Sequence, residues 1–396
     1  MSVTVQQLSE HFSSLTGRKP DGVWSAPGRV NLIGEHTDYN EGFVLPFAID
    51  RRTRAAVGLR SDGIIRVTST FDDTPVEIPL SDLDAARAAG KITGWSAYPL
   101  GVAWALGQHG ADLTTVAGVD IIIDSTVPVG AGLSSSAAIE SSVALALNDL
   151  WSLGFSREKL AKVGQMAEND VVGAPTGIMD QSASLLGAPD SAVFLDCRSL
   201  DATVVPLRLT NAELSILVMD TRVSHSHATG GYSERRASCE AGASAMGTSS
   251  LRDVSVADLD RAREILDDVT FRRVRHVVTE NQRVLDTVRA LNDQGPLAIG
   301  ALLDASHVSM RDDFEISIPE LDLAVETARE HGAIGARMTG GGFGGAAIAL
   351  VPHARVSEVE GAVKEAFAAR GFTEPVTFTV TPSQGAERNT AATPEA

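Results

Sequence analysis

The feature that most constrains this chain is a run of twelve residues that mixes charged, aromatic and apolar side chains, Gly28–Tyr39. The run contains one arginine, two carboxylates, one histidine and one tyrosine, and two glycines punctuate it. A core strand does not hold so many polar groups, and a solvent-exposed loop does not hold so many apolar ones. The run therefore predicts the end of a strand that delivers a polar edge, suited to a polyol, into a pocket.

Length and charge limit the classes of protein to which the chain can belong. It has 396 residues, of which 43% are hydrophobic and 21% charged, and this length suggests two domains or three. The net charge of −18, without any basic stripe, argues against nucleic-acid binding, which needs clustered Lys and Arg. In such an acidic chain a bound nucleotide has to be held locally, by backbone dipoles and a metal.

The cysteines and the absence of apolar runs predict where the protein works. Cys197 and Cys239 are far apart, which favours two free buried thiols and a reducing compartment. The first residues lack the pattern of a secretory signal, and no apolar run reaches the roughly 20 residues that span a membrane. We therefore expect a cytoplasmic protein that binds neither membrane nor nucleic acid, and we expect it to be a monomer.

The spacing of apolar residues predicts a mixed α and β chain. Helical spacing covers 5–15, 81–90, 95–106, 157–169 and 180–186, and strand patterns cover 55–59, 64–68, 119–123, 214–219, 346–351 and 376–380. Ser317-Ile318-Pro319-Glu320 predicts a capping box that opens a helix ending near Glu330. We place the domains at 1–205 and 206–385, and expect the polar tail 386–396 to be disordered.

A segment rich in glycine and serine, Pro128–Ala138, leads into a helical pattern. Its glycines let backbone amides approach an anion closely, and the start of a helix adds unpaired amides and a positive dipole end. The segment is not a Walker A motif, because the chain contains no Gly-Lys-Ser/Thr ending. A tight turn with a serine N-cap would give the same pattern, so the loop by itself leaves both interpretations open.

Two carboxylates twelve residues apart, Glu168 and Asp180, could serve as a metal ligand and a base. Magnesium prefers oxygen ligands and keeps several waters, so one carboxylate and one hydroxyl suffice to hold it. Taken alone, Glu168 also fits a solvated helix residue, and Asp180 fits an ordinary residue in the first turn of a helix. The pattern leaves these alternatives open.

A second glycine-rich motif, Gly335–Gly345, has five glycines among its last six residues. Such a backbone can lie close to another loop or to a ligand. A flexible linker would not lead directly into the strand pattern at 346–351. The motif therefore predicts a loop that packs against a functional site.

Together and in this order, the motifs resemble those of the galactokinases, which belong to the GHMP small-molecule kinases. The resemblance covers nearly the whole chain and includes Gly-Leu-Ser-Ser-Ser-Ala at 132–137 and Gly-Ile-Met-Asp-Gln at 177–181. Two features depart from the family pattern: Thr176 stands where Cys is common, and the region around Tyr232 is less typical. The resemblance implies an α+β, two-domain GHMP kinase fold with the active site in the interdomain cleft.

The resemblance also implies a reaction and a role for each motif residue. The reaction is ATP-dependent phosphorylation of α-D-galactose at the anomeric hydroxyl, with Mg2+ as cofactor, so galactose and MgATP are the expected partners. The implied catalytic residues are Asp180 and Arg29. The implied sugar ligands are Glu35, His36, Thr37, Asp38 and Tyr232. The implied nucleotide ligands are Ser69, Gly130, Ala131, Gly132, Leu133, Ser134, Ser135 and Ser136, and the implied metal ligands are Ser136 and Glu168. Trp95 and Tyr98 are further candidates for the adenosine side, although ordinary core positions explain them equally well.

Two other functions remain compatible with these motifs. The nearer is a related kinase that acts on N-acetylgalactosamine or arabinose. The other is a non-catalytic galactose sensor that controls transcription through a protein partner. Sensors of that kind can lose residues of the serine-rich loop, whereas Ser134–Ala138, Asp180 and Arg29 are all present here, which favours an enzyme.

Overall fold

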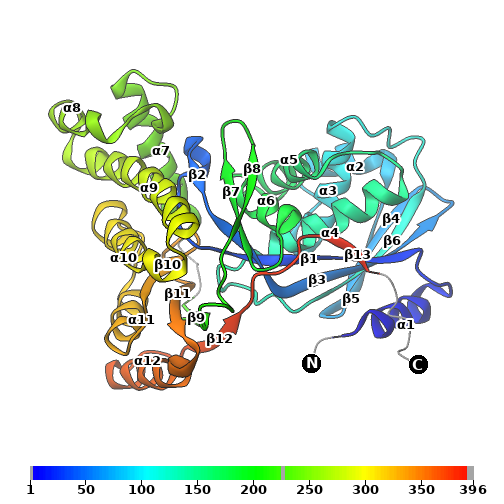
Figure 1. The fold of residues 1–396 in the computed structure, drawn as a ribbon. Helices are drawn as coiled ribbons and strands as arrows, with labels where there is room; N and C mark the ends of the chain where they lie inside the picture. Colours follow the sequence, from blue (N-terminus) through cyan, green and yellow to red (C-terminus); the bar gives the residue numbers. More distant parts are fainter. Residues whose placement is uncertain (1–2, 224–227, 390–396) are drawn as a thin grey trace.

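The structure, a computed structural model, describes residues 3–223 and 228–389 (Figure 1). Its first part is built around a six-stranded sheet in the order β13-β1-β3-β6-β4-β5, in which only the β4–β6 pair is parallel. The elements up to residue 206 are α1 (Val5–Thr16), β1 (Gly22–Asn31), β2 (Phe43–Val44), β3 (Pro46–Arg60), β4 (Ile64–Ser69), β5 (Asp72–Pro79), α2 (Leu83–Ala88), α3 (Ala97–Gln108), β6 (Gly118–Ser125), α4 (Ser135–Leu150), α5 (Arg157–Ala167), α6 (Met179–Leu186), β7 (Ser191–Asp196) and β8 (Ala202–Pro206).

Alternating side chains of this sheet fill two cores. Ala55 and Val57 of β3 belong to the large core beneath α3, α4 and α5, whereas Ala56 between them packs with Phe12 of α1 on the other face. Figure 1 shows the helices from α2 to α6 on one side of the sheet and α1 on the other. The buried sheet thereby gives the end of β1 and the start of α4 a rigid support.

The second part has a four-stranded antiparallel sheet in the order β10-β11-β9-β12, accompanied by helices (Figure 1). Its elements are β9 (Leu214–Asp220), α7 (Ala228–Met246), α8 (Leu259–Ile265), α9 (Asp268–Asp293), α10 (Gly300–Val308), α11 (Pro319–Glu330), β10 (Gly335–Thr339), β11 (Ala346–Pro352), α12 (Val356–Arg370) and β12 (Val376–Val380). No helix in the described ranges is both long and apolar enough to cross a membrane.

Two local predictions are wrong. Residues Glu387–Asn389 form β13 and pair with β1, so this part of the tail is not disordered; residues 390–396 lie outside the described residues. The capping box at 317–320 does not form, because Ile318 is the N-cap residue of α11 and the Ser317 hydroxyl donates to Asp322 instead. The domain boundary near residue 205 stays a prediction.

Candidate active site

A cavity of about 470 Å³ lies between segments of both parts of the chain. Its walls come from the end of β1, the loop before α4, the start of α6, the first turns of α7 and the glycine loop after β10. The lining includes Arg29, Asp38, Ser134, Asp180, Tyr232 and Gly340. The sequence motifs that lie far apart along the chain therefore meet around one space.

Close backbone contact brings the end of β1 against the glycine and serine loop. A Cβ atom at Gly28 would lie 2.6 Å from the Leu133 carbonyl oxygen, so only glycine fits there without a shift. The Arg29 amide donates to the same carbonyl at 3.1 Å. This contact fixes Arg29 beside the loop.

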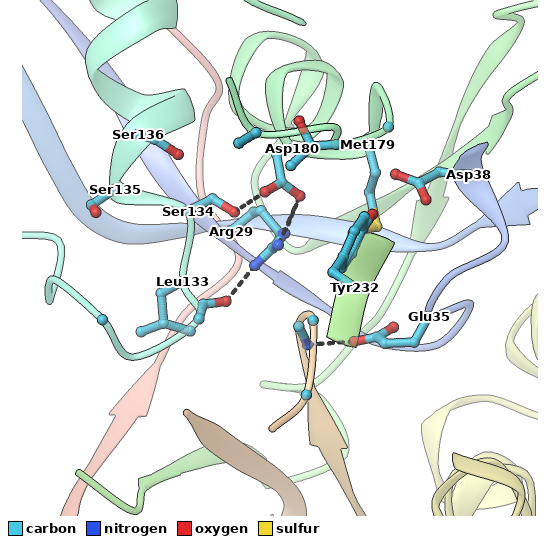
Figure 2. Close-up of a pocket in the computed structure, with 18 of the residues that line it drawn as sticks. Arg29, Glu35, Asp38, Leu133, Ser134, Ser135, Ser136, Met179, Asp180 and Tyr232 are labelled. Atoms are coloured by element: carbon cyan, nitrogen blue, oxygen red, sulfur yellow. Dashed lines mark hydrogen bonds and ion pairs between the residues drawn. The ribbon is translucent and has the colours of Figure 1, made fainter. Parts of the chain in front are cut away.

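Arg29 and Asp180 form an ion pair at the centre of the cavity (Figure 2). Arg29 Nε and Nη2 lie 2.8 and 2.7 Å from Asp180 Oδ1, and Arg29 Nη1 donates to the Gly132 carbonyl at 2.6 Å. The Ser134 hydroxyl donates to Asp180 Oδ2. Both oxygens of the carboxylate are thus oriented by groups that belong to the loop or touch it.

Asp38 lies on the other side of the cavity, where the chain leaves the loop after β1. Its Oδ1 accepts a hydrogen bond from the Tyr39 amide at 2.9 Å. A Cβ at Gly177 would lie 1.9 Å from Asp38 Oδ2, so the glycine leaves room for this carboxylate. Burial, together with the negative charge of Asp180, raises the pKa of Asp38 to about 6.

Glu35 is buried, and its carboxylate contacts residues of both parts of the chain (Figure 2). Its Oε1 accepts from the Thr339 hydroxyl at 3.1 Å and the Gly340 amide at 2.7 Å. Its Oε2 lies 3.1 Å from Arg337 Nη2 and accepts a hydrogen bond from the side-chain amide of Asn31. Burial raises the pKa of Glu35, and the Arg337 charge opposes that rise.

His36 connects the first motif to the glycine loop. Burial lowers the pKa of His36 to about 3, so the ring is neutral at physiological pH. Its Nε2 lies 3.2 Å from the Gly341 carbonyl and its Nδ1 lies 2.8 Å from the Tyr39 hydroxyl. Nε2 therefore carries the hydrogen and donates it to Gly341, while Nδ1 accepts from Tyr39. Both ring nitrogens are used within the protein.

The glycine and serine loop has the conformation that an anion-binding turn requires. Gly130, Gly132 and Ser134 have φ values of 81°, 71° and 55°, and Ser134 directly precedes α4. Such a left-handed sequence of residues turns backbone amides toward the start of the helix. The loop can therefore hold phosphate groups at the cavity.

An oxygen-rich cluster lies beside this helix start. Ser136 Oγ donates to Glu168 Oε1 at 3.0 Å, and Thr176 Oγ1 donates to Glu168 Oε2 at 3.1 Å. Within the described ranges, no group of three or more His, Cys, Asp and Glu residues is suited to a metal. One carboxylate with neighbouring hydroxyls fits a magnesium ion that takes its other ligands from phosphates and water.

Three family signatures match successive parts of the chain. They are the galactokinase galactose-binding signature over 10–59, the GHMP kinases N terminal domain over 97–188 and the GHMP kinases C terminal domain over 287–369. A galactokinase of Streptomyces coelicolor is 54% identical over 96% of this chain and 97% of its own length. A galactokinase of Mycobacterium tuberculosis is 46% identical over 89% of this chain and 95% of its own. The chain belongs to the galactokinase family.

Solved structures confirm the two-domain GHMP kinase fold of this galactokinase-family chain. A Lactococcus lactis galactokinase complexed with galactose is 34% identical and has a TM-score of 0.90, with 97% of this chain and 99% of that chain covered. The Methanococcus jannaschii mevalonate kinase has a TM-score of 0.65 at 18% identity, with 91% and 98% covered. At that lower identity the likeness concerns the fold alone.

Four of the site residues predicted for this galactokinase-family chain do not line the cavity: Thr37, Ser69, Ala131 and Glu168. Thr37 shapes the turn after β1, since its hydroxyl donates to the carbonyls of Gly34 and Phe43 at 2.9 and 2.6 Å. The Ser69 hydroxyl donates to the Asp72 carbonyl at 3.3 Å in the turn between β4 and β5. Glu168 reaches the cavity wall only through Ser136 and Thr176. Tyr98, in contrast, lines the cavity.

Sequence reasoning missed the buried groups that hold these residues in place. Arg337 and Thr339 were given no role, yet both contact Glu35. Glu140 was also missed, although it is a carboxylate on the otherwise apolar face of α4. The available signal was a charged residue in the middle of a buried strand for Arg337 and a charged residue on an apolar helix face for Glu140.

Proposed function

We propose that the chain transfers the γ-phosphoryl group of ATP to the anomeric hydroxyl of α-D-galactose, which gives α-D-galactose 1-phosphate and ADP. The observation that supports this most strongly is the Arg29–Asp180 pair, which lies between a phosphate-type loop and the galactose-binding signature in one cavity. Phosphoryl transfer depends mainly on positioning and on stabilisation of charge, and the cavity supplies groups for both.

In this proposal Asp180 accepts or orients the proton of the attacking hydroxyl. Its position beside the loop, where the Ser134 hydroxyl donates to it, suits a group that lies between the sugar and the γ-phosphate. Arg29 stabilises the negative charge that develops on the transferred group, and its bond to the Gly132 carbonyl keeps it at the loop. Ser134 fixes the rotation of the Asp180 carboxylate.

The sugar would lie against Asp38 and Tyr232. Both side chains line the cavity that Asp180 also lines (Figure 2). An ionised carboxylate accepts a hydrogen bond from a hydroxyl, and a phenol can accept or donate one, which is what recognition of a hexose needs. Glu35, His36 and Thr37 would act indirectly, because their polar side-chain atoms are bonded within the protein.

The nucleotide phosphates would lie on the amides of Gly130–Ser135 at the start of α4. Ser136 and Glu168 would hold Mg2+, which neutralises phosphate charge when it is bound. A cation at this place also offsets the acidic character of a chain with net charge −18.

The test is a comparison of sugars in an ATP-turnover assay. We expect rapid ADP release with galactose and much slower release with glucose, N-acetylgalactosamine and arabinose, with the phosphate on the anomeric carbon by phosphorus NMR. Faster turnover of another sugar would mean that the chain is a related kinase specific for that sugar. Galactose binding without turnover would instead support a sensor.

The metal assignment has its own test. Glu168→Gln should shift the magnesium dependence of the rate to higher concentration and leave the KM for galactose nearly unchanged, because the carboxylate lies beside Ser136 and does not line the cavity in which the sugar would bind. An unchanged magnesium midpoint would remove Glu168 from the metal site. A cytoplasmic location and a monomeric state remain predictions, and the second can be checked by size-exclusion chromatography with light scattering.

A further inference from the structure

A carboxyl group that the proposed chemistry does not use lies directly behind the metal position. Glu140 is on α4, one turn after Ser136, and it is fully buried. It does not line the cavity, so it does not touch the substrates in this arrangement. A buried carboxyl group destabilises the fold unless its oxygens have hydrogen-bond partners. The partners of Glu140 therefore indicate what the group does.

Gln181 connects this carboxyl to Glu168. The Gln181 Nε2 group donates to Glu140 Oε2 and to Glu168 Oε2, both at 2.8 Å. The two amide hydrogens are thus both used, and the orientation of the amide is fixed by two carboxyl groups. Because Gln181 follows Asp180 directly on α6, the same turn of helix carries the proposed base and the link to the metal ligand.

Two oxygens of this hydrogen-bond network, Glu140 Oε1 and Gln181 Oε1, have no hydrogen-bond partner among the residues that the structure describes. Both are buried acceptors, and an acceptor without a donor is destabilising. They belong to the two side chains that already share one N–H···O bond. A carboxylic acid and a primary amide joined in that way can close a second, O–H···O, bond between their remaining oxygens.

The surroundings of Glu140 favour its protonated form. Burial, with the negative charges of Glu168 and Asp180, raises the pKa of Glu140 well above its ordinary value, and the Gln181 hydrogen bond opposes this only in part. Space is also reserved for the pair. A Cβ at Gly164 of α5 would lie 2.8 Å from Gln181 Cγ and 3.4 Å from Glu140 Oε2.

We propose that Glu140 is a positioning residue: as a neutral carboxylic acid it holds the Gln181 amide, and Gln181 in turn holds Glu168 where the metal binds. The inference rests on the proposed function, because it assumes that Glu168 faces the metal. Glu140 would neither bind the metal nor exchange a proton during the reaction. Its neutral state avoids a third negative charge next to Glu168 and Asp180.

The test compares two variants of Glu140 that keep its size. Glu140→Gln supplies an N–H where the acid supplies an O–H. Its magnesium midpoint, the Mg2+ concentration that gives half of the maximal rate, should therefore stay within about twofold of the wild type. Glu140→Met cannot hold the amide and should raise that midpoint about 10-fold, the lower end of the range for residues that orient metal ligands. Calorimetry with Mg2+ and a non-hydrolysable ATP analogue should rank the Mg2+ affinities of the wild type and the two variants in the same order without turnover. The KM for galactose should not change.

A second pair of variants tests the contact between Glu140 and Gln181 through the helix that packs against it. Gly164→Ala should displace Gln181 and raise the magnesium midpoint, whereas Gly361→Ala, at a helical glycine with open space, should not. If Glu140→Met fails to fold, Glu140→Gln and Gly164→Ala still decide the question.

Three results would overturn the proposal: a midpoint in Glu140→Gln as high as in Glu140→Met, wild-type midpoints in both, or no effect of Gly164→Ala. The first would mean that Glu140 acts through its charge. Failure of the proposed function would look different. The wild type itself would then lack galactose-dependent turnover, while the calorimetric comparison would still report on Glu140.

Discussion

At the scale of single residues, the site depends on side chains that hold one another in one orientation. The Arg29 guanidinium is almost fully buried and is shared between Asp180 and the Gly132 carbonyl. Its delocalised charge and fixed fork of donors suit both contacts at once, which a lysine could not provide. The pair therefore presents an oriented carboxylate and a positive charge to the same point of the cavity.

Removal of the Asp180 charge should affect turnover far more than sugar binding. Asp180→Asn keeps the shape of the side chain, and we expect kcat to fall about 10²- to 10⁴-fold, the usual contribution of a general base. Galactose affinity measured by calorimetry should change little. Asp82→Asn, an exposed position on the first domain, is the control. Near-normal turnover in Asp180→Asn would exclude Asp180 from the mechanism.

The raised pKa of Asp38 makes a prediction about stability. Between the ordinary value of 3.8 and about 6, the folded protein keeps a proton that the unfolded chain has lost, so stability falls as pH rises through this window. Asp38→Asn should therefore melt about 2 °C higher than the wild type at pH 8, and the gain should be smaller at pH 5.

The same substitution should weaken sugar binding, because a sugar hydroxyl would lose its charged acceptor, and the KM for galactose should rise about 10-fold with the KM for ATP unchanged. A melting temperature gain that is equal at both pH values would contradict the raised pKa. Equal effects on both substrates would mean that Asp38 organises the fold rather than the sugar.

At the scale of elements, the loop before α4 and the glycine loop after β10 form one wall of the cavity. A Cβ at Gly340 would lie 3.3 Å from the Gly132 carbonyl, and a Cβ at Gly132 would lie 3.5 Å from the Thr339 carbonyl. The two loops come from opposite parts of the chain. Their small residues let the two backbones approach each other closely and form this wall together.

Gly132→Ala tests how much the loop conformation matters. Its φ of 71° strains any residue with a side chain by about 1–2 kcal/mol, so the loop should shift and the KM for ATP should rise. Gly154→Ala is a matched control, because Gly154 has a φ of 66° and open space around it but lies in the connection between α4 and α5. Steady-state kinetics should give a higher KM for ATP in Gly132→Ala than in Gly154→Ala. A similar KM for ATP in both variants would argue against the assignment of the loop to phosphate binding.

At the scale of the whole molecule, a buried group of charges joins the two parts of the chain. Arg337 of β10 is fully buried, and its Nη1 donates to the carbonyls of Asn31 and Leu32 at 3.0 and 3.1 Å. Its Nη2 pairs with Glu35, and its Nε donates to Ser306 Oγ at 3.2 Å. The end of β1 and the start of the glycine loop are thus fixed to each other by one side chain.

Arg337→Met should destabilise the protein by about 3–5 kcal/mol, because it leaves the buried Glu35 carboxylate without its charged partner. Chemical denaturation measures this, and Arg289→Met, at an exposed surface ion pair, should cost less than about 1 kcal/mol. Addition of Glu35→Gln to Arg337→Met should recover part of the loss. A fully additive double variant would show that the two side chains do not interact.

The sequence alone determined what depends on neighbours along the chain. Apolar spacing predicted a helix at 5–15, which corresponds to α1, and strands at 214–219 and 346–351, which correspond to β9 and β11. Motif resemblance predicted the fold and the family, which the comparisons confirm. These signals succeed because helical and strand periodicity, left-handed glycines and short motifs are properties of a few consecutive residues.

The tertiary structure alone decided the partners of the buried polar groups. Arg29 meets Asp180 across 151 positions of sequence, and Glu35 meets Arg337 from another domain. The strand β13 forms because β1 offers it a free edge, which its polar composition could not reveal. Likewise, Gln181 lies in a recognised motif, but only packing places its amide between Glu140 and Glu168. Desolvation makes such partners obligatory, yet which group supplies them is fixed only when distant segments pack together.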